Sequence, residues 1–505
     1  MQIRRLIFVS SLVYLSLACS YSEVVDDEVS LEFEDVVESK KERSLRGAIE
    51  GNLRSLGIGA VYYWGIGDFE GDYDYPGTFD TFWKKMDGGS YIVDDNIALV
   101  NYGHALAGSE YYIIGRNHGL SMNESFWLSF GSSFVWEWLI EYRESFSIND
   151  QVLTPIGGLS IGEFRYQMYQ YLIQSPRDSS FVKKSLAGLV NPDEVLNDMN
   201  SYFFHWDEGG GAFEMIPDFR YSLVHDDLDE SHLEFLFSFH HSTLKESKRF
   251  KHLDMPYYAS LLAEMSASDN AKEDLRLLTE VILWGMYRKS VSGFNRDRVK
   301  STILGIASSF EYSKVNYELR EHWHATTHIL GLFAEQNFET GGWKVKGNVV
   351  VYGNMSLLEP YALVPFQDQR TRWFWQTESW NGGYVHTIGY SVHPSLLISK
   401  GPYEFKAEYD YHNFDILRGL DRDPDFVVNP LDANEWIQEF RFSLGRSFTL
   451  NAKSDTLFIG VTHRINDVSS SLSDKQWGRS SNRLGGSIRV DGHRSTSGVE
   501  VELRF

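Results

Sequence analysis

Long segments in which apolar and polar residues alternate fill the chain from about residue 212. Residues 403–412 read YEFKAEYDYH, with Tyr403 and every second residue after it on one face and Glu404 to His412 on the other. Such alternation is typical of a β-strand, whose successive side chains point to opposite faces. Comparable segments occur at 212–225, 233–243, 256–267, 275–289, 297–313, 323–338, 343–358, 380–396, 436–444, 457–465, 483–491 and 498–505. The chain is therefore predicted to be mainly β, with about 12 antiparallel strands.

The composition of these strands favours a transmembrane barrel. Most have ten or more residues, which suits a tilted strand crossing a bilayer. One face is ionic in strand after strand, and the other is rich in the chain's 28 Tyr, 33 Phe and 14 Trp. A wet lumen accepts charges, and interfacial girdles need aromatic residues. In lipid only a closed sheet satisfies every backbone group. A soluble periplasmic β-protein remains the alternative, because alternation alone does not show which face meets lipid.

The first 18 residues are typical of an export signal. Arg4 and Arg5 precede an apolar stretch at 6–17, and Ser16-Leu17-Ala18 fits a cleavage site before Cys19. The same stretch, LSLAC, partly resembles a lipoprotein signal, although Ser16 stands where leucine is usual. Lipidation of Cys19 and plain cleavage therefore both stay open. No transmembrane helix is expected after the signal, because no uncharged apolar run reaches 18 residues.

Charge and motif content exclude several classes of function. The net charge is -23, with 70 acidic against 47 basic residues, which argues against a nucleic-acid partner. A single cysteine excludes a disulfide framework. No nucleotide-binding or metalloprotease motif is present, so neither a cofactor nor a metal site is predicted. Asp68, Glu70, Asp72 and Asp74 suit a solvated acidic loop, because Tyr73 stands where a calcium loop needs glycine.

The region between the signal and the strands is predicted to be helical from residue 97. Helical spacing follows His104, Gly119 provides a stop, and Ser121 with Glu124 forms a capping-box pattern. A third helix is expected near 161–172. The predicted organisation is a signal at 1–18, an acidic tether at 19–96, a helical domain at 97–205 and a barrel at 206–505.

Two segments resemble known families. The ending GVEVELRF resembles the last strand of bacterial outer-membrane barrels, which commonly ends in phenylalanine, here Phe505. The resemblance implies that the barrel-assembly machinery is a partner. Residues 94–172, with VNYGHALAGSEYYIIGRNHG and SINDQVLTPIGGLSIGE, resemble a bacterial family of unknown function, number 3943. Here Ala105 stands where members often have proline, and the family implies no activity.

The helical domain contains the predicted site. His104, Glu137 and Glu141 are candidate catalytic residues, because two carboxylates at i and i+4 on one helix raise one pKa. The candidate ligand-binding residues are Tyr111, Tyr112, Arg116, Asp150, Gly157, Gly158 and Glu163. A scaffold role is the alternative for all of them, with Arg116 paired to Glu137 or Glu141. The two glycines suit a tight turn after Pro155.

A histidine row is a second candidate. His322, His324 and His328 share one face of a strand, which is predicted to line the lumen. Same-face neighbours are ~7 Å apart, so ligands from other strands would be needed to complete a site. A row of histidines in a wet lumen is the simpler interpretation.

The predicted function is that of an outer-membrane barrel whose specific activity is unknown: a channel, a plugged barrel, or a protein that binds lipid or another ligand. Outer-membrane lipid is its expected partner, and the helices are expected on the periplasmic side or inside the lumen. Two alternatives are an enzyme acting on envelope lipids and a soluble periplasmic binding protein. The substrate and the oligomeric state stay unassigned.

Overall fold

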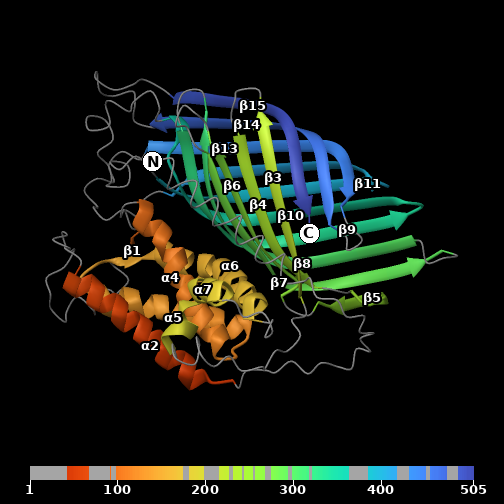
Figure 1. The fold of residues 1–505 in the computed structure, drawn as a ribbon. Helices are drawn as coiled ribbons and strands as arrows, with labels where there is room; N and C mark the ends of the chain where they lie inside the picture. The colour runs from red at the N-terminus through yellow and green to blue at the C-terminus, as the bar shows by residue number, and fades with distance from the viewer. Residues whose placement is uncertain are drawn as a thin grey trace.

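The described part of the protein consists of a helical layer, within residues 45–197, and a β-barrel, within residues 215–504 (Figure 1). The predictions for the signal at 1–18, for Cys19, for the acidic loop at 68–74 and for Phe505 lie outside the described residues. The computed structural model describes residues 43–66, 83, 91–92, 98–173, 181–197, 215–226, 231–241, 244–253, 256–267, 274–293, 298–317, 321–362, 385–417, 431–450, 455–474 and 487–504.

The helical layer begins earlier than predicted, inside the segment expected to be a tether. Asn52 of its first described helix donates to the carbonyl oxygen of Tyr111 at 3.3 Å. None of the described helices has the length and apolar character needed to cross a membrane. The elements of the layer are α2 (Leu45–Val61), η2 (Tyr62–Ile66), β1 (Tyr91–Ile92), α4 (Ala98–Asn117), α5 (Met122–Val135), η3 (Trp136–Ile140), β2 (Phe146–Ser147), α6 (Ile148–Ile173), α7 (Phe181–Val190) and α8 (Pro192–Asn197).

The helix boundaries follow the sequence signals in two places and depart from them in one. α4 ends before Gly119, whose φ is 72°, and α5 begins with the predicted capping box of Ser121 and Glu124. α6, however, spans residues 148–173 with Pro155 inside it, so the predicted start near 161 is wrong. The helix is buried along most of its length, between α4 and the barrel. Burial on several faces removes the apolar periodicity by which a helix is recognised.

The described strands from residue 215 onward form a closed antiparallel barrel. Neighbours in the sheet follow the order β5-β7-β6-β4-β3-β15-β14-β13-β12-β11-β10-β9-β8, and β7 also pairs with β8. The first strand closes on the last, because residues 220–226 pair with 498–504. The strands are β3 (Met215–Asp226), β4 (Ser231–His241), β5 (Ser247–His252), β6 (Tyr258–Ala267), β7 (Leu275–Ser292), β8 (Arg298–Asn316), β9 (Glu321–Thr340), β10 (Trp343–Leu358), β11 (Val385–Lys400), β12 (Tyr403–Ile416), β13 (Leu431–Thr449), β14 (Thr456–Asp474) and β15 (Ser487–Arg504).

Strands β5 and β6 share one position in the wall. β6 pairs with residues 275–281 of β7, and β5 pairs with residues 286–289 of the same strand. The other edge of β7 is occupied by β8. The barrel therefore has 12 strand positions, which confirms the predicted number and fold class.

The two ends of the barrel differ in their connections. At the turn end, β9 joins β10 through Gly341 and Gly342, with φ of 55° and 77°, and β11 joins β12 through Gly401, with φ of 55°. Glycine adopts positive φ without strain, as two-residue hairpin turns require. The end of β15 also lies at the turn end. Longer connections follow β10, β12 and β14 at the opposite end, the loop end.

The last strand shows which face points inward. Arg504 donates to the two carboxylate oxygens of Glu404 at 2.8 and 2.6 Å, and also to Glu502 at 2.8 Å. Glu404 is in β12, which does not adjoin β15, so this contact crosses the interior. Val499 points the other way and is 53% exposed. The prediction that the charged face of GVEVELRF lines the lumen is confirmed.

An apolar belt lies on the outer surface of the turn-end half of the barrel. Outward side chains of β14 between Leu457 and Ile465 are mostly aliphatic, and Ile459 and Val461 are exposed. Beyond Ile465 the outward positions carry Asp467 and then serines. Nine residues of a tilted strand suffice to cross a bilayer. The belt is therefore long enough to span the hydrocarbon core of a bilayer. The loop-end half of the barrel extends beyond the belt.

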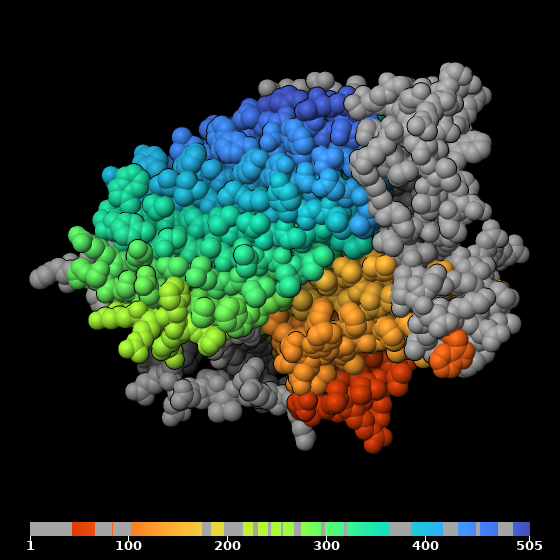
Figure 2. Space-filling model, turned by 180° about the vertical axis from the view of Figure 1, so that it is seen from behind, coloured from red at the N-terminus to blue at the C-terminus, as the bar shows by residue number. Residues whose placement is uncertain are grey.

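The helical layer packs on the outer surface of the barrel. Leu153 of α6 contacts Leu357 and Trp323, and Trp323 faces outward because its neighbours in β9 face the lumen. Phe164 of α6 packs edge-to-face with Phe237 of β4, at 6.2 Å between ring centroids. Figure 1 shows the helices beside the strands, and Figure 2 shows from behind the orange residues of the helical layer against the green residues of the barrel. The expectation that helices fill the lumen is therefore wrong for the described helices.

Candidate functional site

His104 of α4 faces Asp150 at the start of α6. Their Nε2 and Oδ1 atoms are 3.4 Å apart, and Asp150 is 2% exposed. Asn149 donates to the Asp150 carboxylate at 3.0 Å. Burial raises the pKa of Asp150 to about 7, aided by Glu144 and opposed by a hydrogen bond with Ser147. The structure therefore places two predicted site residues side by side.

Glu137 and Glu141 have different partners. Glu137 accepts the backbone N–H of Ser147 at 3.0 Å, and Glu141 accepts the indole N–H of Trp136 at 2.7 Å. The spacing expected of an α-helix does not apply here, because residues 136–140 form the π-helix η3, with i→i+5 hydrogen bonds. Burial and the nearby Glu141 raise the pKa of Tyr111. Each carboxylate thus has a hydrogen-bond donor of its own, and the shared proton site that the helical spacing suggested stays a prediction.

Arg116, Tyr112 and Glu163 form a buried link between α4 and α6. Arg116 Nε lies 3.0 Å from Glu163 Oε2, and the Tyr112 hydroxyl donates to the same oxygen at 2.7 Å. Gln167 also donates to Glu163. Tyr112 and Glu163 have no exposed surface. The predicted pairing of Arg116 with Glu137 or Glu141 is wrong, because Glu163 of α6 occupies that place. These contacts are those of an interhelical cross-link.

Gly157 and Gly158 lie inside α6, so the predicted tight turn is wrong. A Cβ on Gly158 would lie 2.4 Å from the carbonyl carbon of Gly108, and one on Gly157 would lie 2.6 Å from the Cβ of Ala105. The two glycines therefore allow α6 to approach α4 at backbone distance. Gly157 and Gly158 therefore lie at the crossing of α6 and α4.

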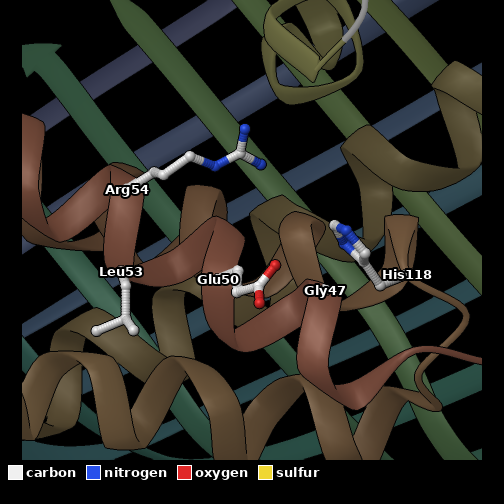
Figure 3. Close-up of a pocket in the computed structure, with 5 residues that line it drawn as sticks. All are labelled: Gly47, Glu50, Leu53, Arg54 and His118. Atoms are coloured by element: carbon white, nitrogen blue, oxygen red, sulfur yellow. The ribbon is translucent and has the colours of Figure 1, made fainter.

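An open cleft lies between α2 and the residues that follow α4 (Figure 3). Glu50 accepts a hydrogen bond from Arg46 at 2.7 Å, and His118 Nδ1 lies 2.9 Å from the carbonyl oxygen of Ile114. The cleft contains none of the predicted site residues. Its lining is Gly47, Glu50, Leu53, Arg54 and His118.

Ion pairs join opposite walls across the barrel interior. Arg441 of β13 donates to both carboxylate oxygens of Glu234 in β4, at 3.1 and 3.0 Å, and to Glu264 of β6 at 2.7 Å. Arg276 of β7 pairs with Asp410 of β12 at 2.9 Å. The strands in each pair are separated by several others in the sheet. Side chains therefore occupy the interior at this level.

A histidine–carboxylate cluster lies in the interior, toward the loop end. His412 Nε2 of β12 is 3.8 Å from Glu311 Oε2 of β8, and the rings of His412 and His324 are 5.2 Å apart. One potential ligand atom of each residue lies within 4.8 Å of the others. All three residues are at most 3% exposed. Three different strands thus supply a site that the histidine row alone could not complete.

Both imidazoles of this cluster are oriented through Nδ1. The Nδ1 of His412 lies 2.9 Å from the hydroxyl oxygen of Ser391. The Nδ1 of His324 lies 3.0 Å from the hydroxyl oxygen of Thr326. A metal-binding histidine is commonly fixed in this way by a hydrogen bond at its other ring nitrogen. Each Nε2 is therefore available to face the cluster.

The carboxylate of Glu311 is held at one oxygen. Arg276 Nε donates to Oε1 at 2.8 Å, while Asp410 compensates the charge of the same arginine at 2.9 Å. Glu311 Oε2 is buried and has no hydrogen-bond partner among the described residues. An unpaired buried carboxylate oxygen is costly, so this atom is the least satisfied part of the cluster.

The predicted histidine row faces the interior but is not wet. His322 Nε2 lies 2.6 Å from Glu435 Oε1, and both residues are buried. His328 has no exposed surface and lies 3.1 Å from Ser309 and 3.2 Å from Ser391 through its two ring nitrogens. The predicted direction of the row is confirmed, and its expected solvation is wrong. Side chains from other strands exclude the water.

The helical layer lies directly behind the cluster. Phe310, adjacent to Glu311 in β8, points outward and contacts Ala105 and Ile161 of the helices. Register shifts interrupt the β8–β9 pairing between Ala307 and Ser309 at the same level. Bulges of this kind bend a strand and redirect its side chains. The strand that carries Glu311 is thus bent by a bulge near this level, and helices support its outer face.

Sequence reasoning missed Glu311 and His412 as partners of the row. The alternation of β12 placed His412 on the polar face, but alternation does not show which strand lies opposite. The signal that could have found them is the register of the barrel, which depends on the bulges and on the closing pair of strands.

Comparison with known proteins identifies one region of the chain. Residues 90–193 match the model of the family described as domain of unknown function DUF3943. The DUF3943 region contains α4, α5, α6 and α7 and ends before the barrel strands, in agreement with the predicted resemblance. No curated protein matches the chain.

The solved structures that the chain matches have very low sequence identity to it. OccAB1 of Acinetobacter baumannii is 7% identical, and the match covers 57% of this chain and 95% of that one, with a TM-score of 0.15. OmpT of Vibrio cholerae, described as an outer membrane protein, is 9% identical, with 58% and 100% covered and a TM-score of 0.17. Scores this low support no transfer of site or activity.

Proposed function

We propose that the chain is an integral protein of the bacterial outer membrane whose barrel encloses a polar binding chamber. The closed antiparallel sheet supports this, because it leaves no unpaired edge for lipid. The belt that includes Ile459 and Val461 suits the hydrocarbon core, and the ionic interior suits a lumen. The expected lipid partner is the lipid that surrounds this belt.

One observation favours a closed chamber over a diffusion channel. Arg441 reaches Glu234 and Glu264 from the opposite wall in direct hydrogen-bond contact. A passage for solutes needs a continuous column of water through the lumen. The interior is occupied at this level, while the His412 cluster lies beyond it toward the loop end. The chamber therefore suits binding better than free passage.

We infer the orientation from the connections. Outer-membrane barrels have short periplasmic turns and longer extracellular loops. The turn end, with Gly341 and Gly401, then faces the periplasm. The helical layer, which packs around Leu357 near the loop end, then lies toward the cell exterior. This proposal replaces the periplasmic placement expected from the sequence.

Single-cysteine labelling tests the orientation. Leu189 of α7 is 81% exposed, and Lys344 lies beside the turn end. We expect Leu189→Cys to react with a membrane-impermeant maleimide on intact cells, and Lys344→Cys to react only after the outer membrane is permeabilised. The chain with Cys19 alone measures the background. The opposite pattern would reverse the orientation.

Membrane fractionation tests the proposed location and fold. We expect the protein in the outer-membrane fraction, resistant to carbonate extraction, with a gel mobility that changes on boiling because a folded barrel resists detergent. We also propose that the assembly machinery recognises the last strand, so Phe505→Ala should reduce the folded fraction. A carbonate-extractable protein without heat-dependent mobility would contradict the proposal.

A further inference from the structure

We propose that the barrel interior binds one divalent transition-metal ion through Glu311, His324 and His412. This inference rests on the proposed function and names the class of ligand for its chamber. The three residues come from β8, β9 and β12, and one potential ligand atom of each lies within 4.8 Å of the others. Two ligands of a tetrahedral zinc ion are about 3.3 Å apart at zinc–nitrogen bonds of about 2.0–2.1 Å. The 3.8 Å from His412 Nε2 to Glu311 Oε2 needs only a small contraction.

The polar contacts of the three residues leave one atom of each for the metal. Ser391 and Thr326 hold the Nδ1 atoms of His412 and His324, which leaves each Nε2 for the metal. Arg276 holds Oε1 of Glu311, which leaves Oε2. Ligands fixed by such hydrogen bonds are typical of metal sites.

The unpartnered oxygen of Glu311 is the independent observation that points to a cation. Oε2 is buried without a hydrogen-bond partner among the described residues, on a side chain that is 2% exposed. A buried carboxylate oxygen normally has a donor or an ion beside it. Arg276 already uses its contacts on Oε1 and on Asp410. A metal ion between Oε2 and the two imidazoles would supply the missing partner.

The donor set selects the class of metal. Imidazole nitrogen suits zinc, iron, cobalt, nickel and copper, whereas calcium and magnesium prefer oxygen ligands alone. Two histidines and one carboxylate are a common set for Zn²⁺ and for Fe²⁺. The binding of neutral imidazole also makes the affinity fall as the pH is lowered.

A neighbouring trio is a weaker candidate. His328, His393 and His412 also bring potential ligand atoms within 4.8 Å of one another. Both ring nitrogens of His328 are already bonded, to Ser309 and to Ser391. A metal there would displace the Ser391 contact, whereas the Glu311 site requires no such exchange.

Metal content of the purified, folded barrel tests the proposal. The protein is refolded with Zn²⁺ or with Co²⁺, passed through a desalting column and assayed by mass spectrometry of the metal. We expect one equivalent of Zn²⁺ and a visible spectrum typical of tetrahedral Co²⁺. Glu311→Gln keeps an oxygen for Arg276 and should weaken Zn²⁺ binding by at least about a hundred-fold, as should His324→Ala. Heat-dependent gel mobility shows that each variant is folded.

Two further variants make the assignment specific. His322→Gln is the matched control, because it changes a histidine of the same strand and face and keeps a donor for Glu435. The His322→Gln variant should retain one equivalent of Zn²⁺. His393→Ala should also retain one, since His393 belongs only to the neighbouring trio.

The outcomes separate this inference from the proposed function. A folded, membrane-integrated wild-type barrel that takes up no Zn²⁺ or Co²⁺ would overturn the metal site and leave the barrel proposal standing. Equal metal content in the wild type and in folded Glu311→Gln would also overturn the site. A chain that does not integrate into membranes would instead overturn the proposed function.

Discussion

Arg441 joins opposite walls of the barrel interior. It donates two hydrogen bonds to Glu234 and one to Glu264, and its side chain is 13% exposed. Arg441→Met keeps a side chain of similar length and removes the charge. Glu264 keeps its contact with Arg464, so the main cost falls on Glu234. Removing one partner of a buried ion pair costs about 3–5 kcal/mol, because the other charge stays buried and uncompensated.

Denaturant unfolding of the barrel refolded in lipid vesicles measures this cost. We expect Arg441→Met to lower the free energy of unfolding by about 3–5 kcal/mol, and Arg441→Met with Glu234→Gln to lower it less, because the unpaired carboxylate is gone. Arg489→Met is the control: its pair with Asp491 is 63% exposed on both sides, so the change should stay within about 1 kcal/mol. An Arg441→Met variant as stable as the wild type would refute the reasoning. So would a double variant whose loss of stability equals the sum of the losses measured for Arg441→Met and for Glu234→Gln separately.

Two further predictions concern the helical layer. Gly108→Ala places a Cβ 1.7 Å from the carbonyl oxygen of Thr154 and should destabilise the α4–α6 crossing by about 3 kcal/mol. Gly103→Ala on the same helix meets open space and should be neutral or stabilising by up to about 1 kcal/mol. Thermal unfolding followed by the helical circular dichroism signal compares the two variants, and equal losses of stability would contradict the close crossing. The pKa of Asp150 is raised from 3.8 to about 7, so the unfolded carboxyl ionises first and the free energy of unfolding should fall by on the order of 4 kcal/mol as pH rises from 4 to 7. Asp150→Asn should flatten that pH dependence, and an unchanged slope would show that Asp150 does not cause it.

The barrel could be predicted from sequence because its signal is local. In β15 the charges of Glu500, Glu502 and Arg504 alternate with aliphatic residues, and the structure places them inside and outside as expected. Strand count followed from the number of such segments. The closing pair of β15 with β3 followed from the physical need to leave no edge in lipid.

The place of the helical layer could not be predicted, because an outward apolar residue looks the same under lipid and under a helix. Phe235, Phe237 and Phe239 of β4 alternate like lipid-facing residues, yet they pack against Phe164 and its neighbours in α6. Helix α6 was also too short in the prediction, since its buried faces erase the apolar periodicity.

Predicting the interior cluster required information that the alternation of apolar and polar residues does not contain. The row at His324 was visible, and its need for ligands from other strands was clear from the spacing along one strand. Which residues complete it depends on the strand register across the lumen, which brings His412 and Glu311 to the same level. One bulge in β8 would shift that level by a residue, and no local pattern in the sequence marks it.

Ion conductance of the purified barrel in a planar lipid bilayer tests the central claim most directly. In the proposed closed chamber, the contacts of Arg441 with Glu234 and Glu264 obstruct the lumen, so the folded wild-type barrel should insert without producing stable open-channel steps. Heat-dependent gel mobility verifies that the preparation is folded, and resistance to carbonate extraction verifies that it is inserted. A steady ohmic conductance from folded wild-type protein would contradict the closed chamber and would show that water runs through the lumen.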